Sequence, residues 1–205
     1  MQMRSANQSR RFGMALVCLT LAACGSSNPN DPNGGGSGSS ASCSSVGVLG
    51  SAKGTITATI NGATFNGGVP TGQAIYTPVA GVPSLGVPAQ DFFTITGICG
   101  DNTSILILAR ATVGTTAIGV DASGNPLRNP QTQQPLVHTA TLQLRQNGVA
   151  AGTWNVSLLG GTGTMTIASV STTAASGSFS LTMVPQAGTP ASGNRAVVGQ
   201  FSVTF

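Results

Sequence analysis

Residues capable of acid–base or nucleophilic chemistry are scarce in this 205-residue chain. It has no glutamate, one histidine, His138, and four aspartates, Asp31, Asp91, Asp101 and Asp121. A glycosidase-type carboxylate pair would need two of these aspartates, but aspartates beside strands and at loop starts are typical of turns. His138 has no partner close to it in the sequence, and no serine lies in a G-x-S-x-G nucleophile motif. The sequence predicts a non-enzymatic protein without catalytic residues.

One segment has the spacing of a metal site. Asp121, Ser123 and Asn125 place oxygen-bearing side chains at alternate positions, as a calcium loop does. The sixth position of such a loop is Pro126 instead of glycine, and the twelfth is Thr132 instead of a bidentate glutamate. These residues are weak calcium candidates, and an Asx-type turn explains the same pattern. The sequence predicts no cofactor.

The rings that could stack on a ligand are few. Tyr76 and Trp154 are the only tyrosine and the only tryptophan, and rings of this kind suit sugar or peptide ligands. Tyr76 belongs to a proline-rich stretch, residues 67–89, and a second long stretch covers residues 121–135. Long loops are uncommon in compact domains unless they bind something or are mobile. Both loops, together with the Tyr76 and Trp154 rings, are candidate ligand-binding regions. For Trp154 the alternative is a place in the core, because it lies among alternating apolar residues.

The predicted secondary structure is made of strands, because the apolar residues recur with a period of two. Residues 54–60 (GTITATI) alternate small or apolar residues with threonine, and Asn61-Gly62 follows at once as a hairpin turn. Further alternating or apolar strand segments cover residues 93–96, 105–108, 141–145, 152–158 and 164–167. The apolar run at 105–108 suits a strand that is covered on both faces. About nine to eleven short strands predict an all-β fold, a single antiparallel β-sandwich or jelly-roll-like domain.

The chain ends in an internal repeat. Residues 177–183 (GSFSLTM) and 199–205 (GQFSVTF) share glycine, phenylalanine, serine and threonine at matching positions. Each copy alternates apolar residues with small hydroxyl side chains, so both are predicted as strands against one core. A loop rich in proline, glycine and serine, residues 185–194, separates them.

The N-terminal 45 residues have another organisation. Arg4, Arg10 and Arg11 precede a short apolar run, residues 12–23, which is too short to span a bilayer and typical of a signal peptide. Residues 24–45 are rich in glycine, serine and asparagine and predict a flexible linker. The predicted organisation is a signal peptide (1–23), a linker (24–45) and a β-sandwich domain (46–205).

The junction Leu21-Ala22-Ala23-Cys24 resembles the lipobox of bacterial lipoproteins. The resemblance implies cleavage before Cys24 and a diacylglycerol with palmitate-type acyl chains on its sulfur, which would anchor the protein to a membrane. Gly25 in place of aspartate implies the outer membrane as the destination within the cell envelope. An ordinary cleaved signal peptide with an incidental cysteine is the alternative. The strand pattern of residues 50–205 also resembles bacterial lipoproteins of unknown function that open with a GTITATING-type hairpin.

Processing at Cys24 would change the charge of the chain. Its formal net charge is +4, but three of its basic residues lie in the predicted leader. The remainder has five basic and four acidic residues, a net charge of +1. That is too little to neutralise a run of phosphates, so the sequence excludes a nucleic-acid partner.

Processing would also leave two of the four thiols, because Cys18 departs with the leader and the sulfur of Cys24 carries the lipid. Cys43 and Cys99 are predicted to form a disulfide, since exported proteins reach oxidising compartments. Two free buried thiols are the alternative. With a single histidine and no CxxC pair, a zinc site is excluded.

Three functions fit the sequence. The first is a membrane-anchored, non-enzymatic β-sandwich that has a structural role or binds a partner. The second is a glycan- or small-molecule-binding module that uses loops 67–89 and 121–135. The third is an outer-membrane barrel, which the lipobox and the scarcity of Trp and Tyr disfavour.

Overall fold

The computed structural model describes residues 53–81, 89–100, 102–120, 125, 128, 138–146, 149–157 and 160–205. These residues form strands and connecting segments, and none of them belongs to a helix that could cross a membrane. The strands are β1 (Gly54–Ile60), β2 (Ala63–Gly68), β3 (Ala74–Thr77), β4 (Phe92–Ile98), β5 (Ser104–Arg110), β6 (Gly114–Gly119), β7 (Thr139–Gln146), β8 (Val149–Val156), β9 (Thr162–Val170), β10 (Ala174–Pro185) and β11 (Arg195–Thr204). The predicted all-β class is confirmed.

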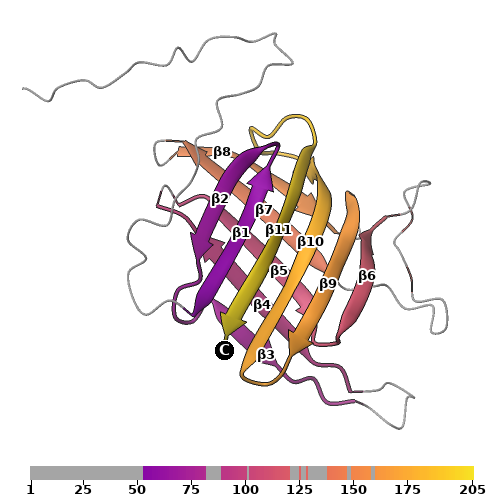
Figure 1. The fold of residues 1–205 in the computed structure, drawn as a ribbon. Coiled ribbons are helices and arrows are strands. Elements are labelled where there is room, and N and C mark those ends of the chain that lie inside the picture. The colour runs from indigo at the N-terminus through magenta and orange to yellow at the C-terminus, as the bar shows by residue number, and fades with distance from the viewer. Residues whose placement is uncertain are drawn as a thin grey trace, which may run out of the picture. The chain divides into compact units, whose positions relative to one another are not determined.

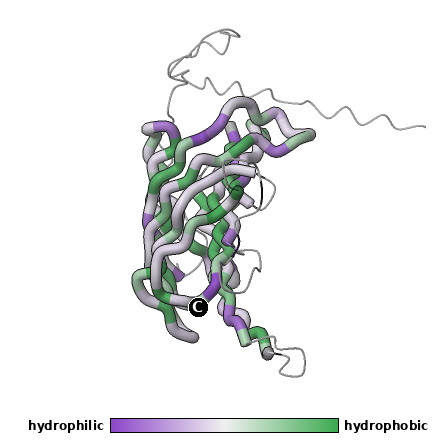
Figure 2. The backbone as a smooth tube through the Cα atoms, turned by 90° about the vertical axis from the view of Figure 1, so that its right-hand side faces the viewer, coloured by the Kyte–Doolittle hydropathy of each residue, from purple (hydrophilic) through white to green (hydrophobic). Residues whose placement is uncertain are grey.

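The strands pair into one continuous antiparallel sheet, which folds over into two layers that we call the front and back sheets. The front sheet has the order β2-β1-β11-β10-β9-β6, and the back sheet has the order β3-β4-β5-β7-β8. The strands of the two sheets cross one another in Figure 1, and Figure 2 shows the sheets from the side. The two layers are joined where β2 pairs with β4 through Gly68 and Ile98, and where β10 pairs with β8 through Val184–Asn155 and Pro185–Trp154. The predicted antiparallel sandwich is therefore the observed architecture.

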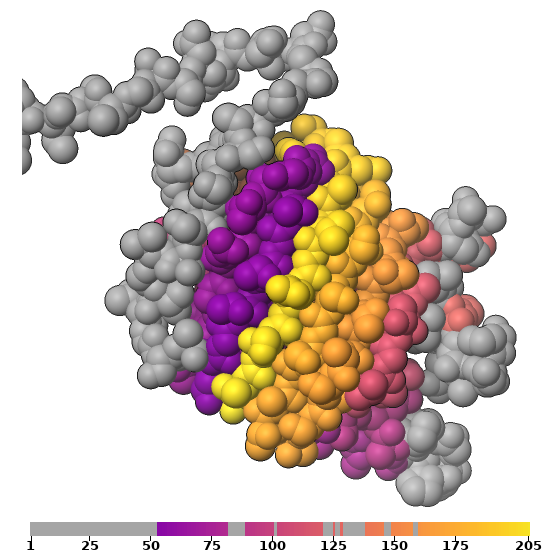
Figure 3. Space-filling view, in the orientation of Figure 1, coloured from indigo at the N-terminus to yellow at the C-terminus, as the bar shows by residue number. Residues whose placement is uncertain are grey.

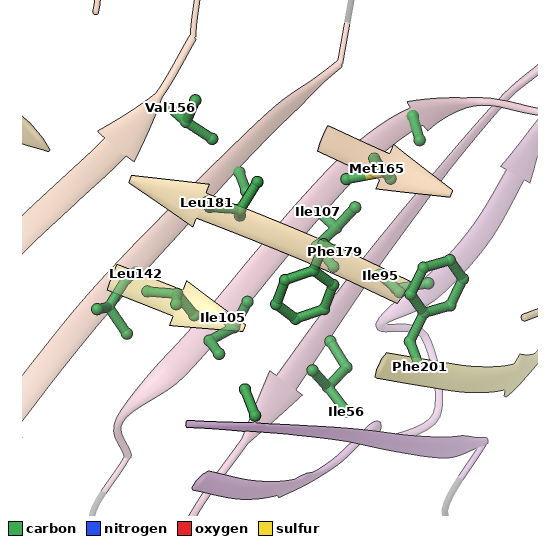
Figure 4. Close-up of a cluster of buried hydrophobic side chains, with 14 of the residues drawn as sticks. Ile56, Ile95, Ile105, Ile107, Leu142, Val156, Met165, Phe179, Leu181 and Phe201 are labelled. Carbon is green, nitrogen blue, oxygen red and sulfur yellow. The ribbon is translucent and has the colours of Figure 1, made fainter. Parts of the chain in front are cut away.

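The core lies between the sheets and follows from the alternation of apolar residues. On the back sheet, Ile95, Ile107 and Leu142 are fully buried, and the front sheet contributes Ile56 and Phe179 from the opposite side (Figure 4). Successive side chains of a strand point to opposite faces, so one face of each strand enters this core. Burying an isoleucine or phenylalanine fully contributes roughly 1.5–3 kcal/mol. The core is thus the main source of stability.

The first hairpin has the predicted turn. Asn61 and Gly62 have φ angles of 48° and 87°, the positive values that a type I′ turn requires at both positions. The turn joins β1 to β2, with Ile60 paired to Ala63. Asn61 also ties the hairpin to β11, because its Oδ1 accepts a hydrogen bond from the Ala196 N–H at 2.8 Å.

The C-terminal repeat is explained by the register of β10 and β11. Gly177 lies opposite Phe201, and Gly199 lies opposite Phe179. A Cβ added to Gly177 would lie 2.8 Å from the Phe201 ring, and one added to Gly199 would lie 2.7 Å from the Phe179 ring. Each glycine therefore makes room for the phenylalanine of the other strand. The prediction that both copies are strands against one core is confirmed.

One prediction about the connections was wrong. Residues 67–89 are not a continuous loop, because β3 pairs along β4 within this range, with Tyr76 opposite Phe93. The strand is only four residues long and Pro78 follows it directly, so its local sequence does not distinguish it from a loop. Residues 82–88, and most of the stretch 121–135, lie outside the described residues.

Candidate functional site

The Tyr76 side chain is partly exposed. It lies on the edge strand β3, and its hydroxyl donates a hydrogen bond to Asp91 Oδ2 at 2.5 Å. This hydrogen bond to the carboxylate, with a smaller effect of desolvation, raises the pKa of Tyr76. The ring also packs against Phe205, with 5.7 Å between ring centroids. Asp91 thus serves as a structural acceptor, and Tyr76 closes one end of the core.

Trp154 belongs to the core. Its side chain on β8 is 1% exposed, and its indole Nε1 donates to the Gly193 carbonyl at 2.8 Å. The guanidinium of Arg195 lies 4.8 Å from the centroid of the ring and covers one face. Tyr76 lies on β3 and Trp154 on β8, and β4, β5 and β7 separate these two strands, so the structure does not bring the rings together. The Trp154 ring offers no exposed face on which a ligand could stack.

His138 is a buried residue at the start of β7. It is 4% exposed, and desolvation, with a smaller effect of the nearby Arg110 charge, lowers its pKa from 6.5 to about 4. Its Nδ1 atom makes no hydrogen bond to the part of the chain that the structure describes. The imidazole is therefore neutral at physiological pH and held by packing.

Three cysteines have a predicted role, and the structure describes only one of them, Cys99. Cys99 follows β4 directly, is 4% exposed, and has its sulfur 3.5 Å from the Asn66 carbonyl oxygen. Cys24 and Cys43 lie outside the described residues. The lipid attachment at Cys24 and the pairing of Cys43 with Cys99 thus stay predictions.

The weak calcium segment is also mostly outside the described residues. Asp121 and Ser123 are not described, and Asn125 is exposed to solvent. Among the residues that the structure describes, no group of three or more histidine, cysteine or acidic side chains could hold a metal ion.

The sequence did not predict a candidate site on the outer surface of the front sheet. We name the outward-facing side chains of β2, β1, β11, β10, β9 and β6 the hydroxyl face. The pairing register sets its central row, one residue from each strand: Asn66, Thr57, Gln200, Ser178, Thr166 and Thr115. The next row is Thr64, Thr59, Val198, Ser180, Thr164 and Ala117.

The hydroxyl face is continuous and neutral. Figure 3 shows it as one surface across β2, β1, β11, β10 and β9. No outward position of these strands carries a charged or aromatic side chain. The outer surface of the back sheet differs, because it carries Phe92, Leu106, Leu108 and Arg110. The alternating threonine and serine residues of β1, β9 and β10 were a signal for this face, but the strand order that assembles it could not be predicted from the sequence.

Comparisons with known protein families, with curated protein sequences and with solved structures found no match to this chain.

Proposed function

We propose that this protein is a lipid-anchored protein of the cell envelope whose β domain binds a partner or has a structural role, without catalysis. The observation that carries the anchor is Leu21-Ala22-Ala23-Cys24 after a basic and apolar leader. A diacylglycerol on Cys24 supplies two acyl chains, and two chains hold a protein stably where one holds it only marginally. Gly25 at the second mature position favours the outer membrane.

The arrangement of the polar groups supports a binding or structural role. Asp91 is held by Tyr76, Arg195 covers the Trp154 ring, and His138 is buried and neutral. General acid–base catalysis needs a titratable group within reach of a substrate and poised near the working pH. In the described part of the chain, each of these groups has a structural explanation instead.

Fractionation of cells that express Cys24→Ser tests the anchor. The wild-type protein stays in the membrane pellet after alkaline extraction and incorporates radiolabelled palmitate, whereas Cys24→Ser is released and unlabelled. Cys18→Ser is the matched control, because this cysteine departs with the leader and its loss leaves anchoring unchanged. Retention of Cys24→Ser in the extracted membranes contradicts the proposal.

We also propose that Cys43 pairs with Cys99. Cys99 is buried at the end of β4, so the bond would fix the end of the linker to the back sheet. This connection would place the boundary between the loose tether and the folded domain at Cys43.

Glycan or small-molecule binding is the second candidate function. The sequence assigned it to Tyr76 and Trp154, but the first ring is engaged by Asp91 and Phe205 and the second is buried. The observation that favours this function is the neutral hydroxyl face.

A further inference from the structure

We propose that β6 pairs edge to edge with β6 of a second copy of this chain, so that the two front sheets join into one. The inference goes beyond the proposed function, because it names a partner of the β domain and the strand that binds it. It rests on the proposed anchor in one respect only, namely that the anchor would bring copies together in one membrane.

β6 is the last strand in the order of the sheet. It pairs with β9 along its whole length, and among the described strands it has no neighbour on its other side. Figure 1 shows β6 at the right-hand end of the front sheet. Unpaired N–H and C=O groups along such an edge are a template for a further strand.

The hydrogen-bond pattern identifies the groups on this open edge. The Val120 N–H donates to the Gly161 carbonyl, just before β9, at 3.1 Å. In an antiparallel pair, residues bonded to the neighbour alternate with residues that are not, so Thr116 directs its N–H and C=O towards β9, whereas Thr115 and Ala117 direct theirs away from it. Thr115 and Ala117 are exposed and form no other backbone hydrogen bond in the part of the chain that the structure describes.

β6 lacks the features that usually block an edge. Sheet edges are commonly protected by very short strands, charged side chains, proline or bulges. β3, at the edge of the back sheet, has only four residues and is followed by Pro78. By contrast, β6 has six residues, GTTAIG, without charge or proline, and its pairing with β9 contains no bulge. This edge can therefore accept a strand over several residues.

The open edge of β6 is complementary to itself. When two copies meet antiparallel with Thr116 facing Thr116 of the second copy, Thr115 of each copy lies opposite Ala117 of the other. The free N–H and C=O groups of these residues then meet, which gives about four hydrogen bonds. The two Thr116 residues form the close, non-hydrogen-bonded pair at the centre. Among the antiparallel registers, this one uses both free residues of each copy.

The contact is small, so it depends on concentration. Pairing of two short strands buries far less surface than a standard interface of about 1,600 Å², and two copies in dilute solution would separate easily. Copies that share a membrane through lipid on Cys24 would have a higher effective concentration. The predicted linker, residues 24–45, would let the two domains turn towards each other.

Cross-linking of the full-length protein tests the contact and its register. Cysteine variants are oxidised with copper phenanthroline in membranes of expressing cells and as purified protein at high concentration. Facing residues of a non-hydrogen-bonded pair have Cα atoms about 4.5 Å apart, within reach of a disulfide, so Thr116→Cys should give a covalent dimer. Thr115→Cys is the matched control, because the two copies of this residue are not opposite each other and lie too far apart to bond. Wild type reports any dimer that forms through the natural cysteines.

Proline at Ala117 tests the edge hydrogen bonds. The Ala117 N–H points to the open edge, so proline removes an edge donor without removing a bond to β9. In the Thr116→Cys background, Ala117→Pro should lower the yield of cross-linked dimer at least about tenfold. Ala117→Thr, which keeps the N–H, should leave the yield within about twofold. The comparison of Thr116→Cys with Thr115→Cys decides the question even where the proline variant fails to fold.

The inference is overturned by the absence of a Thr116→Cys dimer in both preparations, by an equal yield from Thr115→Cys, by a folded Ala117→Pro variant that cross-links unchanged, or by a cross-link to a different protein. The anchor is read separately, from the membrane pellet and the palmitate label. An anchored protein without the Thr116→Cys dimer refutes only the edge contact. An unanchored protein that forms this dimer at high concentration refutes only the anchor.

Discussion

At the residue scale, His138 is a buried ionisable side chain whose Nδ1 has no hydrogen-bond partner in the described part of the chain. Its imidazole is buried beside Arg110, and burial lowers its pKa from 6.5 to about 4. A group whose pKa is lower in the folded state stabilises the fold above its unfolded pKa and loses that contribution as the pH falls through the folded value. The free energy of unfolding should therefore be constant above about pH 7 and fall by about 3 kcal/mol between pH 6.5 and pH 4.

Urea unfolding at a series of pH values measures this effect. Because His138 is the only histidine, a His138→Gln variant should lose the pH dependence in this window while keeping the fold. Equal slopes of stability against pH for wild type and variant would contradict the assignment.

The contacts of Trp154 and Tyr76 could be predicted from the sequence only in part. The alternating apolar residues around Trp154 predict that it lies in a strand and favour a place in the core. They could not show that Arg195 covers its ring or that Asp91 binds Tyr76. Those contacts join residues that are distant in sequence or that lie on separate strands, so only the assembled sheets define them.

At the element scale, the pairing of β10 with β11 depends on two glycines. Gly177→Ala or Gly199→Ala should destabilise the protein by about 1–3 kcal/mol, the usual cost of overpacking a core. The new Cβ would meet the opposite phenylalanine ring, and it would also lie 2.2 Å (Gly177) or 2.4 Å (Gly199) from a backbone carbonyl oxygen.

Gly188→Ala is the comparison for these variants. A Cβ at Gly188 meets nothing within 4 Å, and only its positive φ of 79° opposes a side chain. Its cost should be about 1 kcal/mol, as for other non-glycine residues forced into the left-handed region. Thermal unfolding of the three variants decides the point, and an equal loss in all three would show that the phenylalanine contacts are not the cause.

Most strands could be predicted because their local pattern agrees with their environment. β1 and β10 alternate hydroxyl residues with small or apolar residues over seven or more positions, the end of β11 repeats part of the β10 pattern, and the Asn61-Gly62 turn fixes the first hairpin. The short strand β3 was missed, because four residues before a proline carry little periodic signal. The order of the strands could not be predicted either, because β1 pairs with β11 from the other end of the chain. The hydroxyl face depends on that order, so it could be recognised only in the structure.

At the scale of the whole molecule, the proposed disulfide joins the linker to the domain. The bond between Cys43 and Cys99 would close a loop of 56 residues, for which chain entropy gives about 4 kcal/mol of stabilisation. Reduction of the purified protein should lower the free energy of unfolding by about that amount in denaturant titrations. A Cys43→Ser variant should show the lower stability already and should not respond to reductant. A wild-type protein indifferent to reductant would contradict the pairing.

The proposed membrane anchor requires that the processed chain begin at Cys24 and that this residue carry lipid. The direct measurement is mass spectrometry of the N-terminal peptide of protein purified from its native membranes. We expect a peptide that starts at Cys24 and carries the mass of a diacylglycerol on the sulfur. A peptide that starts elsewhere, or that starts at Cys24 with an unmodified thiol, would contradict it.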